Sequence, residues 1–276
     1  MEIIKARSMG FCFGVRRALR LVEPAAPLES LGPLVHNRQV IEHLARLGVR
    51  TVKSLEELQG PKVAITSHGV GPQVLKELEG RGFQVIDATC PFVRRAQRVA
   101  QAFANAKLDV VIFGDKGHAE VQGELGWTLG KGRATVSYKE LLSDHHLPQR
   151  LGILSQTTQS PARFAHFVGQ VVASNLAQSS ELRVANTICP STRQRQEEAI
   201  RLARKVDLML VIGGRDSANT SLLAQTCAAS GVQTYHVEGA DEVQEAWLDG
   251  RGRVGITAGA STTAETIEEV VERLRE

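Results

Sequence analysis

The sequence predicts an α/β protein with mostly parallel sheets, in which three small units surround a central cavity in a pseudo-threefold arrangement. Three observations lead to this fold class. Short β-branched runs alternate with amphipathic helical runs, a cysteine-led segment occurs three times, and polar loops follow strands at matching places. At 276 residues the chain is long enough for several small domains.

The alternating runs predict the elements in chain order. Strands are expected at residues 2–6, 62–67, 83–87, 109–114, 150–155, 208–214 and 253–258. Amphipathic helices are expected at residues 37–48, 71–82, 160–177, 191–206 and 262–276. Residues 143–152 are expected to form a connecting loop.

Three segments align without gaps, and each begins with a cysteine: CFGVRRALRLV, CPFVRRAQRVA and CPSTRQRQEEA. Their first residues are Cys12, Cys90 and Cys189. Each cysteine is expected at the junction between a strand and a helix, and Pro91 and Pro190 suit the first helical turn. The repeat predicts three units, at residues 1–88, 89–187 and 188–276.

The start of a helix favours the thiolate form of a cysteine through the helix dipole and free N–H groups. Three such thiolates on a threefold axis can hold zinc or an iron–sulfur cluster with one coordination position left open. A lone cysteine is more often a buried, inert residue, and we assign Cys227 that role. The repeated context argues against this role for the other three cysteines.

Polar side chains recur where strands end, which is where parallel α/β sheets bind ligands. Loops of this kind carry His36, His68, His118, Thr157, Ser217, Asn219 and Ser261. Donor-rich side chains and nearby glycines are typical of a site for a phosphate or a diphosphate. The sequence therefore predicts an anion-binding cavity beside the metal.

Glu120 lies two residues after His118, which is the pairing expected of a proton donor and its relay. The alternative is an exposed loop acid. Asp115 and Asp216 compete for the same role, but neither has a histidine neighbour.

Composition and charge point to a cytoplasmic enzyme or binding protein. The net charge of +3 is too small to indicate nucleic acid or a membrane surface as a partner. We expect no membrane span and no signal peptide, because the apolar runs are short. Arginines four apart after two of the cysteines predict a salt-bridged helix surface or, alternatively, a docking patch for an acidic electron donor; they are Arg16, Arg20, Arg94 and Arg98.

The motifs together resemble the LytB family, the 4-hydroxy-3-methylbut-2-enyl diphosphate reductases of the non-mevalonate isoprenoid pathway. They are GFCFGVRRA, LVHN, SHGV, DATCPFV, GHAEVQG, SQTT, TICPSTRQRQ, DSANTS and TAGAS, and they span nearly the whole chain.

The resemblance implies one [4Fe–4S] cluster per chain, held by Cys12, Cys90 and Cys189. It also implies that Glu120, His118 and Thr157 are catalytic. The implied diphosphate ligands are His36, His68, His118, Ser217, Asn219 and Ser261, with Thr157 at the substrate hydroxyl. The implied reaction is a two-electron reductive dehydroxylation to isopentenyl and dimethylallyl diphosphate, the last step of the pathway, with electrons from a ferredoxin- or flavodoxin-type donor.

The sequence departs from the family pattern at a few positions. Ala119 and Ala218 stand where proline and serine are common, and GASTTAE replaces GASAPE, which should alter the start of the last helix and leave Ser261 in place. Two alternatives differ from the reductase in metal or in chemistry: a cysteine-ligated zinc hydrolase of a phosphorylated substrate, and a non-catalytic iron–sulfur sensor.

Overall fold

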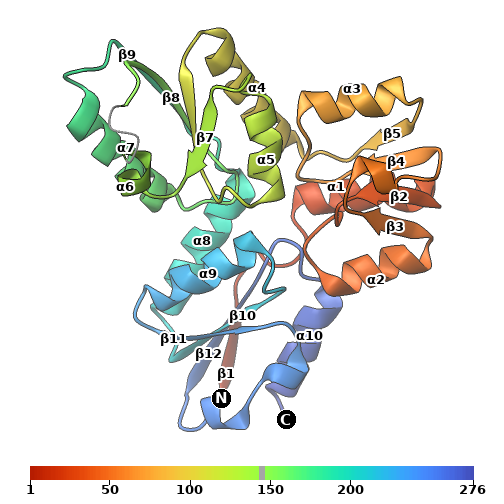
Figure 1. Ribbon diagram of the computed structural model, residues 1–276. Helices are drawn as coiled ribbons and strands as arrows, with labels where there is room; N and C mark the ends of the chain where they lie inside the picture. The colour runs from red at the N-terminus through yellow and green to blue at the C-terminus, as the bar shows by residue number, and fades with distance from the viewer. Residues whose placement is uncertain (143–146) are drawn as a thin grey trace. The chain divides into compact units, whose positions relative to one another are not determined.

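The structure is a computed structural model that describes residues 1–142 and 147–276. Part of the expected loop at 143–152, namely residues 143–146, lies outside the described residues. Within the described chain, three parallel four-stranded sheets alternate with helices, which confirms the α/β class (Figure 1). No helix among these residues is long and apolar enough to cross a membrane.

The first sheet joins the two ends of the chain. Its strand order is β1 (Glu2–Lys5), β12 (Arg253–Ala258), β10 (Leu208–Ile212) and β11 (Gln233–Val237). The helices along this part of the chain are α1 (Phe13–Val22), α8 (Pro190–Ala203), α9 (Ala218–Ala228) and α10 (Ala264–Arg273). Two short 3-10 turns follow β11, at Ala240–Glu242 and Glu245–Trp247.

Strand β10 shows why this sheet has helices on both faces. Its five residues LMLVI are all buried. Leu208, Leu210 and Ile212 pack with the residues of α10, whereas Met209 and Val211 pack with those of α8 and α9. Successive side chains of a strand point to opposite faces, so a continuous apolar run requires cover on both.

The second sheet has the order β3 (Val49–Val52), β2 (Leu28–Leu31), β4 (Lys62–Ile65) and β5 (Gln84–Asp87). Helix α3 (Pro72–Gly80) connects β4 to β5, and α2 (Arg38–Arg46) connects β2 to β3. Two 3-10 turns, Glu23–Ala25 and Leu55–Glu57, flank these strands.

The third sheet has the order β7 (Gly132–Thr135), β6 (Asp109–Phe113), β8 (Arg150–Ser155) and β9 (Glu181–Ala185). Its helices are α4 (Pro91–Asn105), α5 (Ala119–Gly126), α6 (Tyr138–Leu141) and α7 (Pro161–Asn175). Phe113 of β6 packs against Phe164 and Phe167 of α7, with ring centroids 5.6 and 4.9 Å apart.

Contacts group the chain into two compact units. One comprises residues 1–19, 35–47 and 190–276 and contains the first sheet; the other comprises 20–34 and 48–189 and contains the second and third sheets. The ranges 1–88, 89–187 and 188–276 expected from the repeat each hold the strands of one sheet, apart from β1. The sequence places β1 in the first range, whereas the structure pairs it with β12. The boundaries themselves stay a prediction.

Candidate active site

The three repeated cysteines occupy equivalent places in the three sheets. Each follows an edge strand: β1 precedes Cys12, β5 precedes Cys90 and β9 precedes Cys189. Each begins a helix, namely α1, α4 and α8. None of the three forms a disulfide among the described residues, and all three are half-buried. The strand–cysteine–helix junction expected from the sequence is therefore present three times.

Each cysteine amide donates a hydrogen bond to the loop that follows the neighbouring inner strand. The acceptors are Ala260 for Cys12 at 2.9 Å, Ser67 for Cys90 at 3.0 Å and Thr157 for Cys189 at 3.0 Å. Ser261 and His68 directly follow two of these acceptors in sequence, and Thr157 is itself the third. The same backbone bond thus ties each cysteine to a residue that the sequence places in the substrate site.

The second inner strand of each sheet leads to the other predicted ligands. In sheet order this strand is β10, β2 and β6. The loops and helix starts after these strands carry Ser217 with Asn219, His36, and His118 with Glu120. Polar groups therefore gather at the carboxyl ends of two adjacent inner strands in every sheet, as the sequence predicted.

Glu120 is the buried acid of this set. Its side chain is 2% exposed. Thr157 donates to both of its oxygens, from the backbone N–H to Oε1 at 2.6 Å and from the hydroxyl to Oε2 at 2.9 Å. Burial raises the pKa of Glu120 more than these two hydrogen bonds lower it. The carboxyl group of Glu120 is therefore buried, fixed beside the Thr157 hydroxyl, and more easily protonated than an exposed glutamate.

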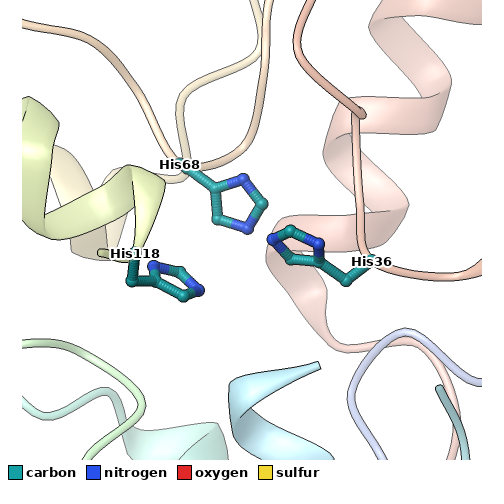
Figure 2. Close-up of side chains that lie close together, drawn as sticks. All are labelled: His36, His68 and His118. Atoms are coloured by element: carbon teal, nitrogen blue, oxygen red, sulfur yellow. The ribbon is translucent and has the colours of Figure 1, made fainter. Parts of the chain in front are cut away.

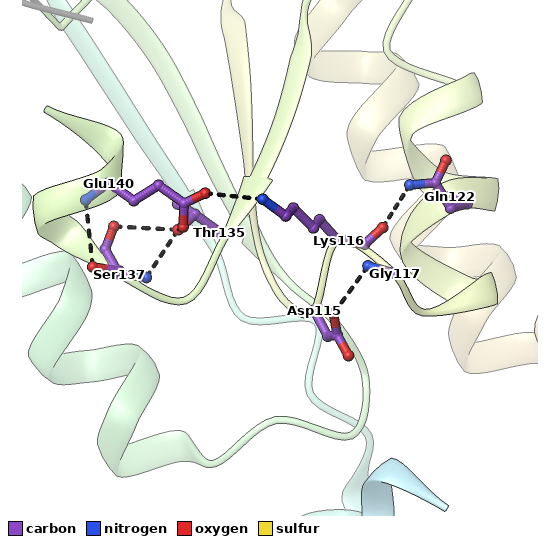
Figure 3. A network of polar contacts seen from close by, with 7 residues as sticks. All are labelled: Asp115, Lys116, Gly117, Gln122, Thr135, Ser137 and Glu140. Atoms are coloured by element: carbon purple, nitrogen blue, oxygen red, sulfur yellow. Dashed lines mark hydrogen bonds and ion pairs between the residues drawn. The ribbon is translucent and has the colours of Figure 1, made fainter. Parts of the chain in front are cut away.

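The competing acids have surface roles. Asp115 is exposed, and its Oδ1 accepts from the Gly117 N–H at 2.9 Å, which shapes the turn before His118. Figure 3 shows this turn continuing into a polar network in which Lys116 contacts Glu140 at 3.4 Å. The Thr135 hydroxyl donates to Glu140 at 2.7 Å. Asp216 is also exposed. These contacts anchor the loop and leave Glu120 as the one buried acid among the three candidates.

His68 and His118 lie edge to face, with ring centroids 5.2 Å apart and an angle of 89° between the rings (Figure 2). His118 caps α5, because its Nδ1 accepts a hydrogen bond from the Glu120 N–H at 3.2 Å. A neutral imidazole that accepts at Nδ1 carries its proton on Nε2. His118 therefore presents an N–H donor, which suits an anionic oxygen.

His36, Ser217 and Ser261 come together within the unit that holds the first sheet. The Ser261 hydroxyl donates to the His36 carbonyl at 3.2 Å. Ser217 caps α9, its hydroxyl accepting from the Thr220 N–H at 3.3 Å. Burial lowers the pKa of His36, and the nearby charge of Asp216 opposes this effect. A helix N-terminus beside these donors is a favourable place for an anion.

Two glycines make this arrangement possible. A Cβ at Gly214 would lie 3.2 Å from the His36 carbonyl oxygen, and one at Gly259 would lie 2.0 Å from Thr220 Oγ1. Asn219 adds a buried amide whose Nδ2 has no hydrogen-bond partner among the described residues. An unsatisfied buried donor in a cluster of donors is what an anion site shows without its ligand.

A family model described as "LytB protein" matches residues 3–275. The chain belongs to the LytB family. A relative in Dehalococcoides mccartyi, named 4-hydroxy-3-methylbut-2-enyl diphosphate reductase, is 48% identical over 274 residues, which are 98% of this chain and 96% of the relative. A relative of the same name in Geobacter metallireducens is 44% identical, and the match covers 100% of this chain and 98% of the relative. The resemblance inferred from the motifs is confirmed.

Solved structures agree with the LytB assignment. One is titled as the structure of (E)-4-hydroxy-3-methyl-but-2-enyl diphosphate reductase, the terminal enzyme of the non-mevalonate pathway. It matches at 37% identity with a TM-score of 0.70, over 100% of this chain and 99% of that chain. A reductase structure from Plasmodium falciparum matches at 23% identity with a TM-score of 0.93, and the match covers 100% of this chain and 88% of that chain. This likeness shows the shared fold.

The departures from the LytB pattern fall at helix starts. Ala119 is the first residue of α5 and Ala218 the first of α9. In both helices the residue before the alanine provides the cap, so the caps do not depend on the substituted side chains. At the last helix, Thr263 caps α10 by accepting from the Thr266 N–H at 3.1 Å, which replaces a proline start with a hydrogen-bonded one.

The sequence reasoning missed two residues. Glu124 lies one turn after Glu120 on α5 and is 0% exposed. Arg195, 4% exposed on α8, donates to the carbonyl oxygens of Ser8, Gly10 and Ala258 and so ties the loop before Cys12 to the helix after Cys189. The i, i+4 spacing of Glu120 and Glu124 was a signal that could have found the first; nothing local marks the second.

Cys227 has the structural role that the sequence predicted. It is 0% exposed in the apolar cluster between α8, α9 and the first sheet. Burial raises the pKa of its thiol to about 12. A thiol that stays protonated at neutral pH is neither a ready nucleophile nor a ready metal ligand.

Proposed function

We propose that this chain is a 4-hydroxy-3-methylbut-2-enyl diphosphate reductase. It removes the hydroxyl group of its substrate with two electrons and releases isopentenyl and dimethylallyl diphosphate. The observation that carries the proposal is a backbone hydrogen bond that occurs three times, from each repeated cysteine to a loop that bears a proposed substrate-binding residue. That bond couples the redox ligands to the anion-binding side chains in the same way in all three sheets.

The cysteines fit a [4Fe–4S] cluster with three protein ligands. Cys12, Cys90 and Cys189 are half-buried cysteines at helix starts. The Cys12 sulfur accepts from the Val15 N–H at 3.5 Å. N–H groups directed at sulfur favour the thiolate that such a cluster requires. When bound, the cluster would supply electrons one at a time and an iron with an open coordination position.

The diphosphate would bind to hydrogen-bond donors at loop ends and helix starts. The donors would be His36, His68, His118, Ser217, Asn219 and Ser261. These groups are neutral or singly charged and lie at loop ends, which suits several hydrogen bonds to phosphate oxygens without a Walker-type loop.

Glu120 would act as the acid for the substrate oxygen. Burial raises the pKa of Glu120, and the Thr157 hydroxyl, 2.9 Å from Glu120 Oε2, would orient the substrate hydroxyl and pass the proton of Glu120 on to it. His118 holds the start of α5 through the Glu120 N–H, so it orients the acid while its Nε2 faces the anion.

The electrons would come from a small acidic donor of the ferredoxin or flavodoxin class. Arg16, Arg20 and Arg98 are exposed, whereas Arg94 forms an ion pair with Asp87. We place the enzyme in the cytoplasm, where a reducing environment keeps the ligand thiols from forming disulfides.

The test is anaerobic purification followed by iron, sulfide and zinc analysis and turnover with a one-electron artificial reductant. We expect four iron and four sulfide per chain and formation of both diphosphate products. Stoichiometric zinc would instead indicate a hydrolase, and a complete cluster without turnover would indicate a sensor; either result overturns the proposal.

A further inference from the structure

Glu124 is a second carboxyl group, buried beside Glu120, the proposed acid. It lies four residues after Glu120 on α5, so the two side chains share one face of the helix. Glu120 is 2% exposed and Glu124 0%. Neither oxygen of Glu124 has a hydrogen-bond donor among the described residues. Two carboxyl groups thus lie in the protein interior with no cation between them.

The two carboxyl groups differ in the hydrogen bonds that they accept. Thr157 supplies a donor to each oxygen of Glu120, which tolerates an ionised form. Glu124 receives no such donor, and its side chain bonds to the side chain of Glu120. A buried carboxylate without a donor is very costly. Glu124 is therefore the neutral acid of the pair.

The electrostatics point the same way. Burial raises the pKa of Glu124 well above its usual value, and the charge of Glu120 raises it further. Helix α5 packs against α4 and β7, against the loop that carries Gly69, and against Thr157. Across the described residues of these elements, Glu120 is the one charged group that shifts the pKa of Glu124. His118 contacts α5 at its first turn, through the backbone N–H of Glu120.

Packing alone does not explain an acid at this place. An apolar side chain would fill the same space without the cost of desolvating a carboxyl group. The groups that a structural carboxyl would hold in place, such as an arginine or a helix N-terminus, are not bonded to it in the described chain.

The proposed reaction needs more protons than one acid carries. Breaking the C–O bond of an allylic alcohol with two electrons gives R–CH2–OH + 2e⁻ + 2H⁺ → R–CH3 + H2O, or the isomer with the double bond shifted. One proton leaves with the hydroxyl oxygen as water, and the other forms the new C–H bond. The electrons come from the ferredoxin- or flavodoxin-class donor, and Glu120 can deliver one proton before it must be reloaded.

We propose that Glu124 is the proton reserve of this site, and that it reloads Glu120 within a single turnover after Glu120 has given its own proton to the substrate oxygen. This role rests on the proposed function. Glu124 acts through Glu120 and touches no substrate atom. The transfer moves one proton from the Glu124 carboxyl to the Glu120 carboxylate along the side-chain hydrogen bond between them. The protonated Glu120 then donates to the ionised Glu124 until Glu124 is reprotonated between turnovers.

The test compares Glu124→Gln with Glu124→Asp and with Glu79→Gln, an exposed control on α3. Glutamine keeps the shape but stores no proton. We expect kcat of Glu124→Gln to become first order in proton concentration, falling about tenfold per pH unit above neutrality, with KM unchanged. We expect Glu124→Asp and the control to keep the flat profile of the wild type. A flat profile in a folded Glu124→Gln variant overturns the proposal.

A second measurement does not depend on turnover. Infrared difference spectra in H2O and D2O detect the carbonyl stretch of a protonated carboxyl group. We expect a band at neutral pH that persists in Glu120→Gln and disappears in Glu124→Gln. If the wild type lacks reductase activity but shows this band, the proposed function fails while the proton store stands. If the band is absent from the wild type, or survives in Glu124→Gln, the store is refuted.

Discussion

The amide N–H of Cys189 donates a 3.0 Å hydrogen bond to the carbonyl oxygen of Thr157, whose own N–H and hydroxyl bind Glu120. One residue therefore links a proposed cluster ligand to the proposed acid. Both links pass through Thr157, so this residue fixes the position of Cys189 relative to the Glu120 carboxyl group. We expect a substitution at either residue to disturb the hydrogen bonds of Thr157.

Replacing the acid tests its chemical role. Glu120→Gln keeps a side chain that can bond to Thr157 but cannot release a proton. We expect kcat to fall by about 100-fold or more with substrate affinity retained. Turnover with an artificial reductant measures kcat, and calorimetry measures binding. Turnover equal to that of the wild type would remove Glu120 from the mechanism.

Replacing a ligand cysteine tests the cluster assignment. Cys90→Ser should lose the cluster or hold it only weakly, because a serine oxygen is a poorer ligand for iron than a thiolate. Cys227→Ala is the matched control, since Cys227 is buried and its thiol has a raised pKa. Iron and sulfide content per chain is the measurement. Full occupancy in Cys90→Ser would show that Cys90 is not a ligand.

The close approach at Gly259 can be tested by a rescue experiment. Gly259→Ala would place a Cβ 2.0 Å from Thr220 Oγ1, which should destabilise the fold by about 2 kcal/mol and weaken diphosphate binding at Ser261. Thr220→Ala removes the clashing hydroxyl, which has no hydrogen-bond partner among the described residues. We expect the double variant to regain much of the loss, as measured by thermal unfolding and by diphosphate binding. A double variant no better than Gly259→Ala would contradict the steric explanation.

The loop before Cys90 should depend on pH through Asp87. Hydrogen bonds from Thr89, and the ion pair with Arg94, lower the pKa of Asp87 despite the opposing effect of burial. A lowered folded-state pKa stabilises the fold above the unfolded value of about 3.9, and this stabilisation is lost as the pH falls through the folded-state value. We expect Asp87→Asn to cost about 1 kcal/mol at pH 7 and little at the acid end. Urea unfolding across this range checks it, and a pH-independent difference would show that the charge is irrelevant.

Sequence periodicity predicted the inner strands well because they are apolar on both faces. The strands at 62–67, 109–114 and 208–214 appear as β4, β6 and β10. The sequence pattern missed four of the six edge strands, β3, β7, β9 and β11. Strand β7, for example, is short, with the sequence GRAT, and only its last residue is buried. An edge strand is paired on one side and half-solvated, so its apolar pattern is weak.

The sequence pattern also failed to predict one inner strand, for a different reason. Strand β2 reads LESL and contains Glu29, a charged residue that is 6% exposed. Its carboxylate accepts from the backbone N–H groups of Gln59 and Gly60 at 2.8 and 3.0 Å, and pairs with Arg50. Partners 21 to 31 residues away make this burial possible, and no local pattern reveals them.

The candidate site was predictable in its residue types but not in its internal contacts. Motifs placed the cysteines, histidines and Glu120 at loop ends; the structure puts the cysteines and histidines there and Glu120 in the first turn of α5. The hydrogen bonds through Thr157 and the burial of Glu124 arise from packing of α5 against other elements, and such packing is set by the whole fold.

The pairing of β1 with β12 has a consequence for how the protein is made. Residue 2 lies opposite residue 253 in the parallel register. A contact of such long sequence separation forms late, because the intervening chain must first be synthesised and closed into a loop. The amide of Cys12 reaches Ala260 from the same end of the chain. The backbone contacts that fix β1 and Cys12 therefore form only after residues 253–260 have been synthesised.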